Sequence, residues 1–232
     1  MTENRKPPTA SEIVIPEPTL RRIPMYYQYL KRKQQDERLD ASSSTTMAAD
    51  LSLNPIQIRK DLEWIGATGK PRTGYDIEIL LAHMEDFLGY NNAHDAFIVG
   101  AGHLGQALLG YEGFEDYGLN IVAAFDSDPA KADMLVAGKK VLPMEKLEDM
   151  VKRLHILIGI LAVPSYEAQT VCDRMVAAGI KAVWNFTPYH LTVPDGVIVQ
   201  HENMATSLAV LANKLEVALR KAREQGNHHD HK

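Results

Sequence analysis

The residues from Ala96 to Gly105 carry the pattern with the most specific chemistry in this sequence. Four apolar residues run into a glycine-rich turn, and helix-forming residues follow. This is the strand, turn and helix order of a dinucleotide-binding fingerprint. The first glycine permits the tight turn, the second lets the backbone approach a pyrophosphate, and the third lets the helix pack on the strand. The pattern predicts a cofactor site made by Gly100, Ala101, Gly102, His103, Leu104 and Gly105.

A carboxylate after the next apolar run strengthens this prediction. Asp126 ends the run that begins at Ile121, and it lies 26 residues after Gly100. An acid in this place binds the adenosine ribose hydroxyls of NAD, and its charge disfavours the 2′-phosphate of NADP. Val163, Pro164 and Phe186 end two later apolar runs, where ligands of such sheets bind. We expect them to form an apolar nicotinamide side without an anion, which favours neutral NADH over cationic NAD⁺.

Elements that position these residues follow from the alternation of apolar runs with helical stretches. Between residues 91 and 202 this alternation predicts an α/β domain of the Rossmann-like type, with a doubly wound parallel sheet. A helix follows over residues 203–225, with one apolar stripe. Such a stripe needs a surface to cover, and a partner subunit is as good a candidate as the chain itself. The stripe consists of Leu208, Leu211, Leu215 and Leu219.

The part of the chain before this domain differs from it in charge. Residues 19–75 carry ten Lys or Arg and six Asp or Glu, a net charge of +4, whereas residues 76–232 have a net charge of −8. A basic module on an acidic body suggests a polyanion as its partner. Helices are predicted over residues 19–35, with Thr19 as N-cap and Pro24 in the first turn and a half, and over residues 45–51. A third begins after Asn54.

The third helix has the layout of a DNA-reading element. Asn54 is a good N-cap, Pro55 suits the first position, and Gln57 is placed to close a capping box. A short helix, a turn and a second helix form a helix-turn-helix, and the following Gly- and Pro-containing stretch reads as a hairpin wing. The alternatives are a solvated charged face and an ordinary surface turn. The predicted DNA contacts are Asn54, Gln57, Arg59 and Lys60 on the helix, with Lys70 and Arg72 on the wing.

Composition bounds the class of protein. The single cysteine, Cys172, excludes an internal disulfide framework, fits a reducing cytoplasm, and lies where a buried small hydrophobe is expected rather than a reactive thiol. There is no run of 18 apolar residues and no signal peptide, so we expect a cytoplasmic protein without a membrane span. Residues 1–18 are expected to be a disordered arm. The His-containing residues 226–232 are expected to be a disordered tail rather than a metal site.

Several observations weigh against an enzyme. A simple NAD-dependent enzyme on this fold needs a substrate domain and a proton donor beside the nicotinamide. The stretch after Val199 is too short for such a domain, and His103 lies in the phosphate loop. We therefore expect a regulator. A small NAD-dependent oxidoreductase and a CoA- or nucleotide-binding interaction protein remain as alternatives.

Short motifs in a fixed order resemble the Rex family of redox-sensing transcriptional repressors. The resemblance covers about residues 17–219. It implies a winged-helix domain over residues 19–90, a homodimer with exchanged C-terminal helices, and operator binding that NADH relieves. The motifs, with x for a position outside the motif, are Glu17-Pro18-Thr19-Leu20-Arg21-Arg22-Ile23-Pro24, Gln57-Ile58-Arg59-Lys60-Asp61-Leu62, Gly74-Tyr75-Asp76, Gly100-Ala101-Gly102-x-Leu104-Gly105, Tyr111-x-Gly113-Phe114, Ala123-Ala124-Phe125-Asp126, Asn185-Phe186-x-Pro188 and Glu202-Asn203.

The resemblance also implies a polar switch between the domains. Arg21 or Arg22 and Tyr111 match residues that the family uses for it. Ala205 stands where the family usually has an aspartate, the expected partner of the switch arginine. We therefore expect the coupling between NADH and DNA to be weaker here, or differently wired.

Overall fold

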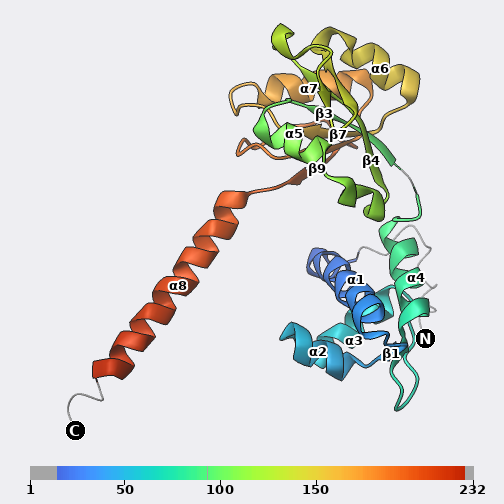
Figure 1. Cartoon of the computed structure of the whole chain (residues 1–232), viewed down its shortest axis with the longest axis vertical. Helices are drawn as coiled ribbons and strands as arrows, with labels where there is room; N and C mark the ends of the chain where they lie inside the picture. Colours follow the sequence, from blue (N-terminus) through green and yellow to red (C-terminus); the bar gives the residue numbers. More distant parts are fainter. Residues whose placement is uncertain (1–14, 93, 228–232) are drawn as a thin grey trace, which may run out of the picture. The chain divides into compact units, whose positions relative to one another are not determined.

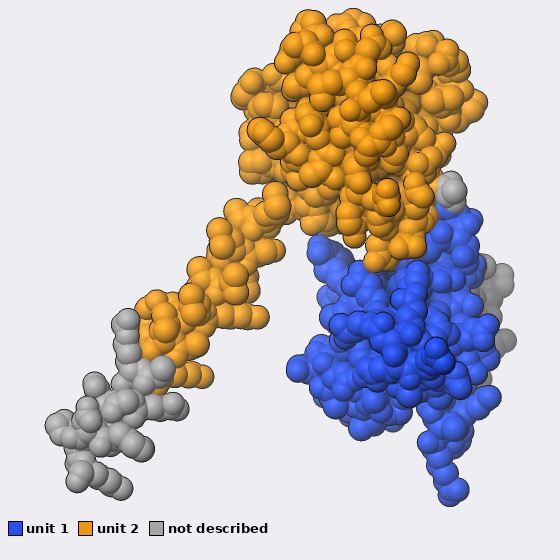
Figure 2. Space-filling model, viewed as in Figure 1, with its two compact units in different colours: residues 1–92 blue, residues 93–232 orange. Residues whose placement is uncertain are grey.

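The chain divides into two compact units, and each is described by itself. The computed structural model describes residues 15–92 and 94–227, and the units comprise residues 1–92 and 93–232 (Figure 2). The division falls close to the boundary that we predicted between residues 90 and 91. The two units differ in secondary structure, since unit 1 is mostly helical and unit 2 contains a large sheet.

Unit 1 is a winged-helix domain. Its elements are α1 (Glu17–Glu37), β1 (Ala41–Ser42), α2 (Ser44–Leu51), α3 (Pro55–Trp64), β2 (Tyr75–Asp76) and α4 (Ile77–Leu88) (Figure 1). α1 contacts both α3 and α4, α2 packs on α3, and β1 pairs with β2 in antiparallel fashion. Each helix contributes fully buried apolar side chains to the core, among them Ile23, Leu30, Met47, Ile58, Leu62, Ile77 and Met84.

The start of α1 differs from the prediction. The helix begins at Glu17 after Pro16, so residues 17 and 18 are helical and do not belong to an arm. The predicted N-cap, Thr19, lies inside the helix and is only 3% exposed. Pro24 therefore lies further into the helix than the first turn and a half, and α1 continues through it. Residues 15 and 16 of the predicted arm precede the helix without regular structure, and residues 1–14 lie outside the described part of the chain.

Local capping explains where the next helices begin. The Ser43 hydroxyl accepts the Thr46 N–H at 3.0 Å, which starts α2 one residue earlier than predicted. Asn54 Oδ1 accepts the Ile56 N–H at 2.8 Å, with Pro55 in the first position of α3, as predicted. The predicted capping box, in which the Gln57 side chain would accept the Asn54 N–H, is not among the hydrogen bonds of the described residues; the Gln57 amide instead donates to Asp61 Oδ1 at 2.9 Å.

The predicted wing is a tight turn with almost no strand. Lys70 and Gly74 exchange two backbone hydrogen bonds of 2.7 and 2.9 Å, and they form a single bridge. The strand expected before the turn is absent from this described segment, whereas the strand after the turn, β2, pairs with β1 and not across a hairpin. Gly74 has φ +81°, a backbone conformation that favours glycine, and a side chain there would overlap the Ser42 carbonyl. The close approach of the turn to β1 therefore requires glycine at this position.

Unit 2 contains a seven-stranded sheet in the order β5-β6-β4-β3-β7-β8-β9. The neighbouring pairs are parallel except β5 with β6, which is antiparallel, so the doubly wound parallel sheet is confirmed and the β5–β6 hairpin is an addition. The strands are β3 (His94–Val99), β4 (Leu119–Asp126), β5 (Leu135–Val136), β6 (Lys139–Pro143), β7 (Ile158–Leu161), β8 (Ala182–Asn185) and β9 (Ile198–His201).

Helices cover both faces of this sheet (Figure 1). α6 (Leu147–Leu154) and α7 (Ala168–Ala178) form one core with Phe97 and Val99 of β3. α5 (His103–Leu109) and the 3-10 helix Glu112–Tyr117 lie over the other face, with Ile98. Two further 3-10 helices are Pro129–Lys131 and Met144–Lys146. Adjacent residues of β3 thus serve opposite cores, as expected for a strand covered on both faces.

Cys172 lies on the buried side of α7, in the core that this helix shares with α6. Its side chain is fully buried, and burial raises the pKa of the thiol to about 11. A thiol that stays protonated at neutral pH is a poor nucleophile. The structure therefore confirms the prediction of a buried small hydrophobe.

The last helix, α8 (Met204–Asn227), begins one residue later than predicted. All its side chains from Met204 to Lys221 are exposed, including the four leucines of the apolar stripe at 44–65%. Among the described residues, no helix combines the length and the apolarity that crossing a membrane requires. The described residues also hold no cluster of three His, Cys, Asp or Glu side chains suited to a metal ion, and the tail histidines His228, His229 and His231 lie outside them.

Candidate DNA-binding and dinucleotide-binding sites

α3 places its apolar residues inward and its basic residues outward. Ile58 and Leu62 are fully buried, whereas Arg59 and Lys60 are exposed on the first turns of the helix. This division follows from the helical spacing of the two apolar residues. Two cations next to a capped helix start are therefore available to a polyanion.

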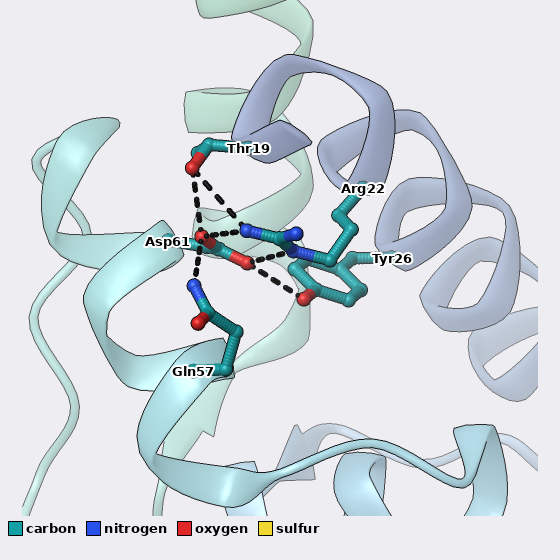
Figure 3. A network of polar contacts seen from close by, with 5 residues as sticks. All are labelled: Thr19, Arg22, Tyr26, Gln57 and Asp61. Carbon is teal, nitrogen blue, oxygen red and sulfur yellow. Dashed lines mark hydrogen bonds and ion pairs between the residues drawn. The ribbon is translucent and has the colours of Figure 1, made fainter. Parts of the chain in front are cut away.

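A buried carboxylate, Asp61, fixes α3 on α1 (Figure 3). Arg22 donates from Nε to Asp61 Oδ2 at 2.6 Å and from Nη2 to Oδ1 at 2.9 Å. The Tyr26 hydroxyl donates to Oδ2 at 2.8 Å, and the Thr19 hydroxyl donates to Oδ1 at 3.0 Å. The Gln57 amide donates to Oδ1 at 2.9 Å from the preceding turn of α3. Asp61 is fully buried, so these donors replace the water that a carboxylate needs.

The network keeps Asp61 ionised. Burial by itself raises the pKa of the carboxyl, but hydrogen bonds from Arg22, Tyr26, Gln57 and Thr19 outweigh it and hold the pKa below its usual value. The hydrogen bond to Asp61 raises the pKa of Arg22. The pKa of Tyr26 is raised mainly by burial and, to a smaller extent, by its hydrogen bond to the same carboxylate. Each group is therefore stabilised in the charge state that its partners require.

The sequence analysis did not single out Asp61. Its signal is present, since Asp61 lies three residues after Ile58 and four before Ile65, on the buried stripe of α3. A charged residue on a buried stripe needs a partner, and that partner lies 39 residues away in α1. Gln57, which we predicted as a DNA contact, is partly buried with its amide on this carboxylate.

A groove separates α3 from the wing. It has a volume of about 500 Å³ and brings together three of the predicted DNA contacts, Arg59, Lys70 and Arg72. Glu63 is the only acid among its lining residues. The other three predicted contacts, Asn54, Gln57 and Lys60, do not line this groove. The geometry offers a cationic channel beside the exposed start of the helix.

The glycine-rich turn of unit 2 has the geometry that the fingerprint requires. Gly100 has φ +102°, and a side chain there would overlap the Ala162 carbonyl of the neighbouring strand end. A side chain on Gly105 would overlap the Gly100 carbonyl, so the helix packs on the turn only with glycine there. Nothing lies within 4 Å of a side chain placed on Gly102, which leaves its backbone open to a ligand.

Asp126 connects this turn to the end of β4. Its Oδ2 accepts hydrogen bonds from the Ala101 N–H at 2.8 Å and from Lys131 Nζ at 2.9 Å, and the second of these is also an ion pair. Its Oδ1 accepts the Asp128 N–H at 2.8 Å. Burial raises the pKa of this carboxyl, but the Asp128 N–H, Lys131 and the Ala101 N–H outweigh it and lower the pKa. Lys131 was not predicted from the sequence, although it follows Asp126 by only five residues.

One cavity of about 560 Å³ unites five of the predicted cofactor residues, Gly100, Gly102, Asp126, Val163 and Pro164. Ala101 and Gly105 are buried behind the turn, His103 is exposed, and Leu104 is half-buried; none of these four lines the cavity. Phe186 does not line it either, because its ring packs beside Trp184 on the α5 side of the sheet.

The expectation of an anion-free nicotinamide side is wrong. Four acids, Asp126, Asp128, Glu145 and Glu167, line the cavity together with the two cations Lys131 and Arg174. Acids occur there because the cavity mouth is made by loops and helix ends, whose side chains the strand pattern does not predict. Its charge therefore does not by itself favour neutral NADH over NAD⁺.

The predicted switch residues have local partners. Arg22 is held by Asp61, whereas Arg21 forms an exposed pair with Glu17 one turn earlier, at 2.7 Å. Tyr111 is 55% exposed and packs edge-on against Phe114 in unit 2. Phe114 in turn contacts Trp184, so Tyr111 ends a row of aromatic rings on the α5 side of the sheet.

Two family models match the chain. One is described as a putative DNA-binding protein N-terminus and matches residues 14–63; the other is described as a CoA binding domain and matches residues 91–189. Curated relatives include the redox-sensing transcriptional repressor Rex of Treponema denticola, 46% identical over 84% of this chain and 92% of the relative. The protein of the same name from Bacteroides fragilis is 41% identical over 93% of this chain and 97% of the relative.

Solved structures agree with both units. A crystal structure of RSP in complex with NAD⁺ and operator DNA has a TM-score of 0.83, with 33% identity over 93% of this chain and 99% of that one. A structure of the same protein with NADH has a TM-score of 0.82, with 34% identity over 91% and 99% of the two chains. RSP is described as a Rex-family repressor.

A winged-helix unit and a Rossmann-like unit in one chain define the class of the protein: a DNA-binding transcription regulator whose second domain binds a nucleotide. Two relatives that are 46% and 41% identical cover 84% and 93% of this chain. The chain belongs to the Rex family of redox-sensing transcriptional repressors.

Proposed function

We propose that this protein represses transcription as a homodimer, binds operator DNA through unit 1, and releases it when NADH binds unit 2. The observation that carries the proposal is the cavity that unites Gly100, Gly102 and Asp126 in the same chain as an exposed, cationic recognition helix. RSP, which shares both units, has been crystallised with operator DNA and with both nicotinamide dinucleotides.

The DNA contacts divide into reading and positioning. Arg59 and Lys60 enter the major groove, because they are exposed on the first turns of α3 while its apolar face is buried. Lys70 and Arg72 contact DNA phosphates from the wing. Arg59 also lines the groove of the protein that separates α3 from the wing. Asn54 caps α3 and Gln57 is held by Asp61, so we propose that both act chiefly by fixing the helix.

The cofactor contacts follow from the cavity. Gly100 and Gly102 bring the backbone close to the pyrophosphate, and Asp126 accepts hydrogen bonds from the adenosine ribose. Val163 and Pro164 lie at the end of β7 and contact the nicotinamide half. Ala101, His103, Leu104 and Gly105 shape the turn, while Phe186 supports the sheet from the opposite face.

The α8 stripe carries the proposal of a homodimer. Four leucines at helical spacing are exposed on this described helix, and burying them against another apolar surface is favourable. A second copy of the chain offers such a surface. A dimer also presents two recognition helices to two half-sites of an operator. Arg21 and Tyr111 are the exposed members of the predicted switch, and we assign the relay of NADH binding to them.

We propose that NADH is read and not consumed. The family consists of regulators. Its proposed ligands, chromosomal DNA and the nicotinamide dinucleotides, are found in the cytoplasm, so we propose that the protein acts there. The competing candidate ligand is CoA, because the matched domain is described as a CoA binding domain. Asp126 at the end of β4 favours a dinucleotide with a free ribose hydroxyl over a CoA ribose, which carries a 3′-phosphate.

The test uses the full-length protein and a duplex from the upstream region of its own gene, with a scrambled duplex of equal length as control. We expect specific binding of the first duplex, release by NADH, and no effect of CoA at the same concentration. Incubation with NADH and small carbonyl compounds should leave the absorbance of the reduced nicotinamide unchanged. Equal binding of both duplexes, or release by CoA and not by NADH, would contradict the proposal.

A further inference from the structure

Lys131 gives the proposed ribose site an unexpected charge. Its Nζ lies 2.9 Å from Asp126 Oδ2, the carboxylate oxygen that also accepts the Ala101 N–H. The Asp126 side chain is 10% exposed and the Lys131 side chain 29% exposed, so the pair is largely shielded from water. A shielded pair is screened less by salt than a surface pair.

The local backbone holds Lys131 in this position. It is the last residue of the 3-10 helix Pro129–Lys131, which the Asp128 side chain caps by accepting the Ala130 N–H at 2.9 Å. Asp126 Oδ1 accepts the Asp128 N–H at 2.8 Å and ties the start of this turn to the same carboxylate. The ammonium group is therefore positioned by the loop as well as by its ion pair.

The other lining cation of the cavity, Arg174, already has partners. It donates to Glu148 at 2.9 Å and to the Met144 carbonyl at 3.0 Å. Lys131 is thus the cation that borders Asp126, where the ribose of a dinucleotide would lie.

The usual discrimination against a 2′-phosphate depends on an unopposed carboxylate. Here the ammonium group offsets the charge of the Asp126 carboxylate and leaves Asp128 as the other acid of this loop on the cavity wall, so the repulsion of a dianionic phosphate is reduced. We infer that Lys131 is a specificity-determining residue: it weakens the preference for NADH over NADPH, and it binds the 2′-phosphate when Asp126 loses its charge. This inference rests on the proposed function of the cavity.

The experiment measures NADH and NADPH affinities of the full-length protein by fluorescence titration at fixed ionic strength. Lys131→Met keeps the length of the side chain and removes the charge, so the NADPH affinity should fall about tenfold more than the NADH affinity. Asp126→Asn frees Lys131, so the preference should shift toward NADPH by about 10- to 100-fold, the range for hydrogen bonds to charged groups. The double variant Asp126→Asn with Lys131→Met should lose that gain.

Lys140→Met is the matched control, because it removes one positive charge from an exposed position of the same unit. It should leave the ratio of the two affinities within about twofold of the unmodified value. A gain of NADPH binding in Asp126→Asn that survives Lys131→Met would overturn the inference, because repulsion by Asp126 alone would then explain it. An unmodified protein that binds neither dinucleotide would instead contradict the proposed function.

Discussion

Arg22 and Asp61 form a two-point contact across 39 residues of sequence, with hydrogen bonds of 2.6 and 2.9 Å to the two carboxylate oxygens. The contact joins α1 to the helix that presents Arg59 and Lys60. Because Asp61 is fully buried, its charge depends on Arg22, Tyr26, Thr19 and Gln57 for solvation. The position of the recognition helix is therefore coupled to the first turns of α1.

The first prediction concerns the stability of unit 1. Arg22→Ala leaves a buried carboxylate without its cation, which typically costs about 3–5 kcal/mol. We expect the free energy of unfolding, measured in urea, to fall by about 3 kcal/mol. Arg21→Ala is the matched control, since Arg21 is an exposed neighbour in a one-turn pair and should cost less than about 1 kcal/mol. Equal losses in the two variants would contradict the role of the Asp61 contact.

A second prediction concerns pH. The folded pKa of Asp61 lies below its ordinary value of about 3.9, so ionisation stabilises the folded state fully above that value. This contribution is lost as the pH falls through the folded pKa. Comparing unmodified protein with Asp61→Asn should show a constant advantage of the unmodified protein near neutral pH. The advantage should shrink below about pH 4. An advantage that grows on acidification would have the wrong sign.

The third prediction concerns operator recognition. Lys60→Ala should remove specific operator binding at fixed salt and leave NADH binding unchanged, because Lys60 lies on the exposed start of α3 and far along the chain from the cavity. Fluorescence anisotropy with labelled operator measures the first effect. Lys140→Ala controls for the loss of one positive charge. Undiminished operator affinity in Lys60→Ala would exclude this placement of α3.

The wing should behave differently from the helix. Lys70→Ala or Arg72→Ala should weaken binding to operator and to scrambled duplex by similar factors. The slope of log affinity against log salt should flatten by about one unit for each lost phosphate contact. A selective loss of operator binding in these variants would instead assign base reading to the wing.

Features with local causes could be predicted from the sequence. The cap at Asn54, the glycine turn at Gly100 and the buried strands β3 and β7 depend on neighbours within a few residues, and the structure has them where expected. The hairpin β5–β6 was missed, because Leu135–Val136 is too short to show a strand pattern. Its pairing with Lys139–Pro143 becomes visible only in the sheet.

The features of the candidate sites that the sequence analysis missed have a common physical origin. Asp61 and Lys131 act through partners that helical or strand periodicity does not identify, so neither was recognised. Phe186 follows a strand end as predicted, but its ring packs on the opposite face beside Trp184. The end of a strand predicts which edge of the sheet a residue occupies, whereas its side of the sheet depends on register and on the packing of distant residues.

The fourth prediction concerns assembly through α8. Replacing Leu211 and Leu215 by Asp puts two charges on the apolar stripe, where each leucine is about 60% exposed in the single chain. We expect the homodimer to dissociate or the protein to aggregate, as measured by sedimentation equilibrium. Changing Lys214 to Asp, an exposed charged residue of the same helix, should leave the mass unaltered. A dimer of unchanged stability in the double variant would place the interface elsewhere.

The most direct test of redox sensing is the coupling between NADH and operator DNA, measured in both directions at one salt concentration. Binding free energies are reciprocal, so NADH must weaken operator binding by the same factor by which operator weakens NADH binding. We expect a factor in the lower half of the usual range of about 5- to 150-fold, because Ala205 lacks the carboxylate expected of the switch. NAD⁺ should have a much smaller effect. Operator affinity unchanged by NADH, or equal release by NAD⁺, would contradict redox sensing by this protein.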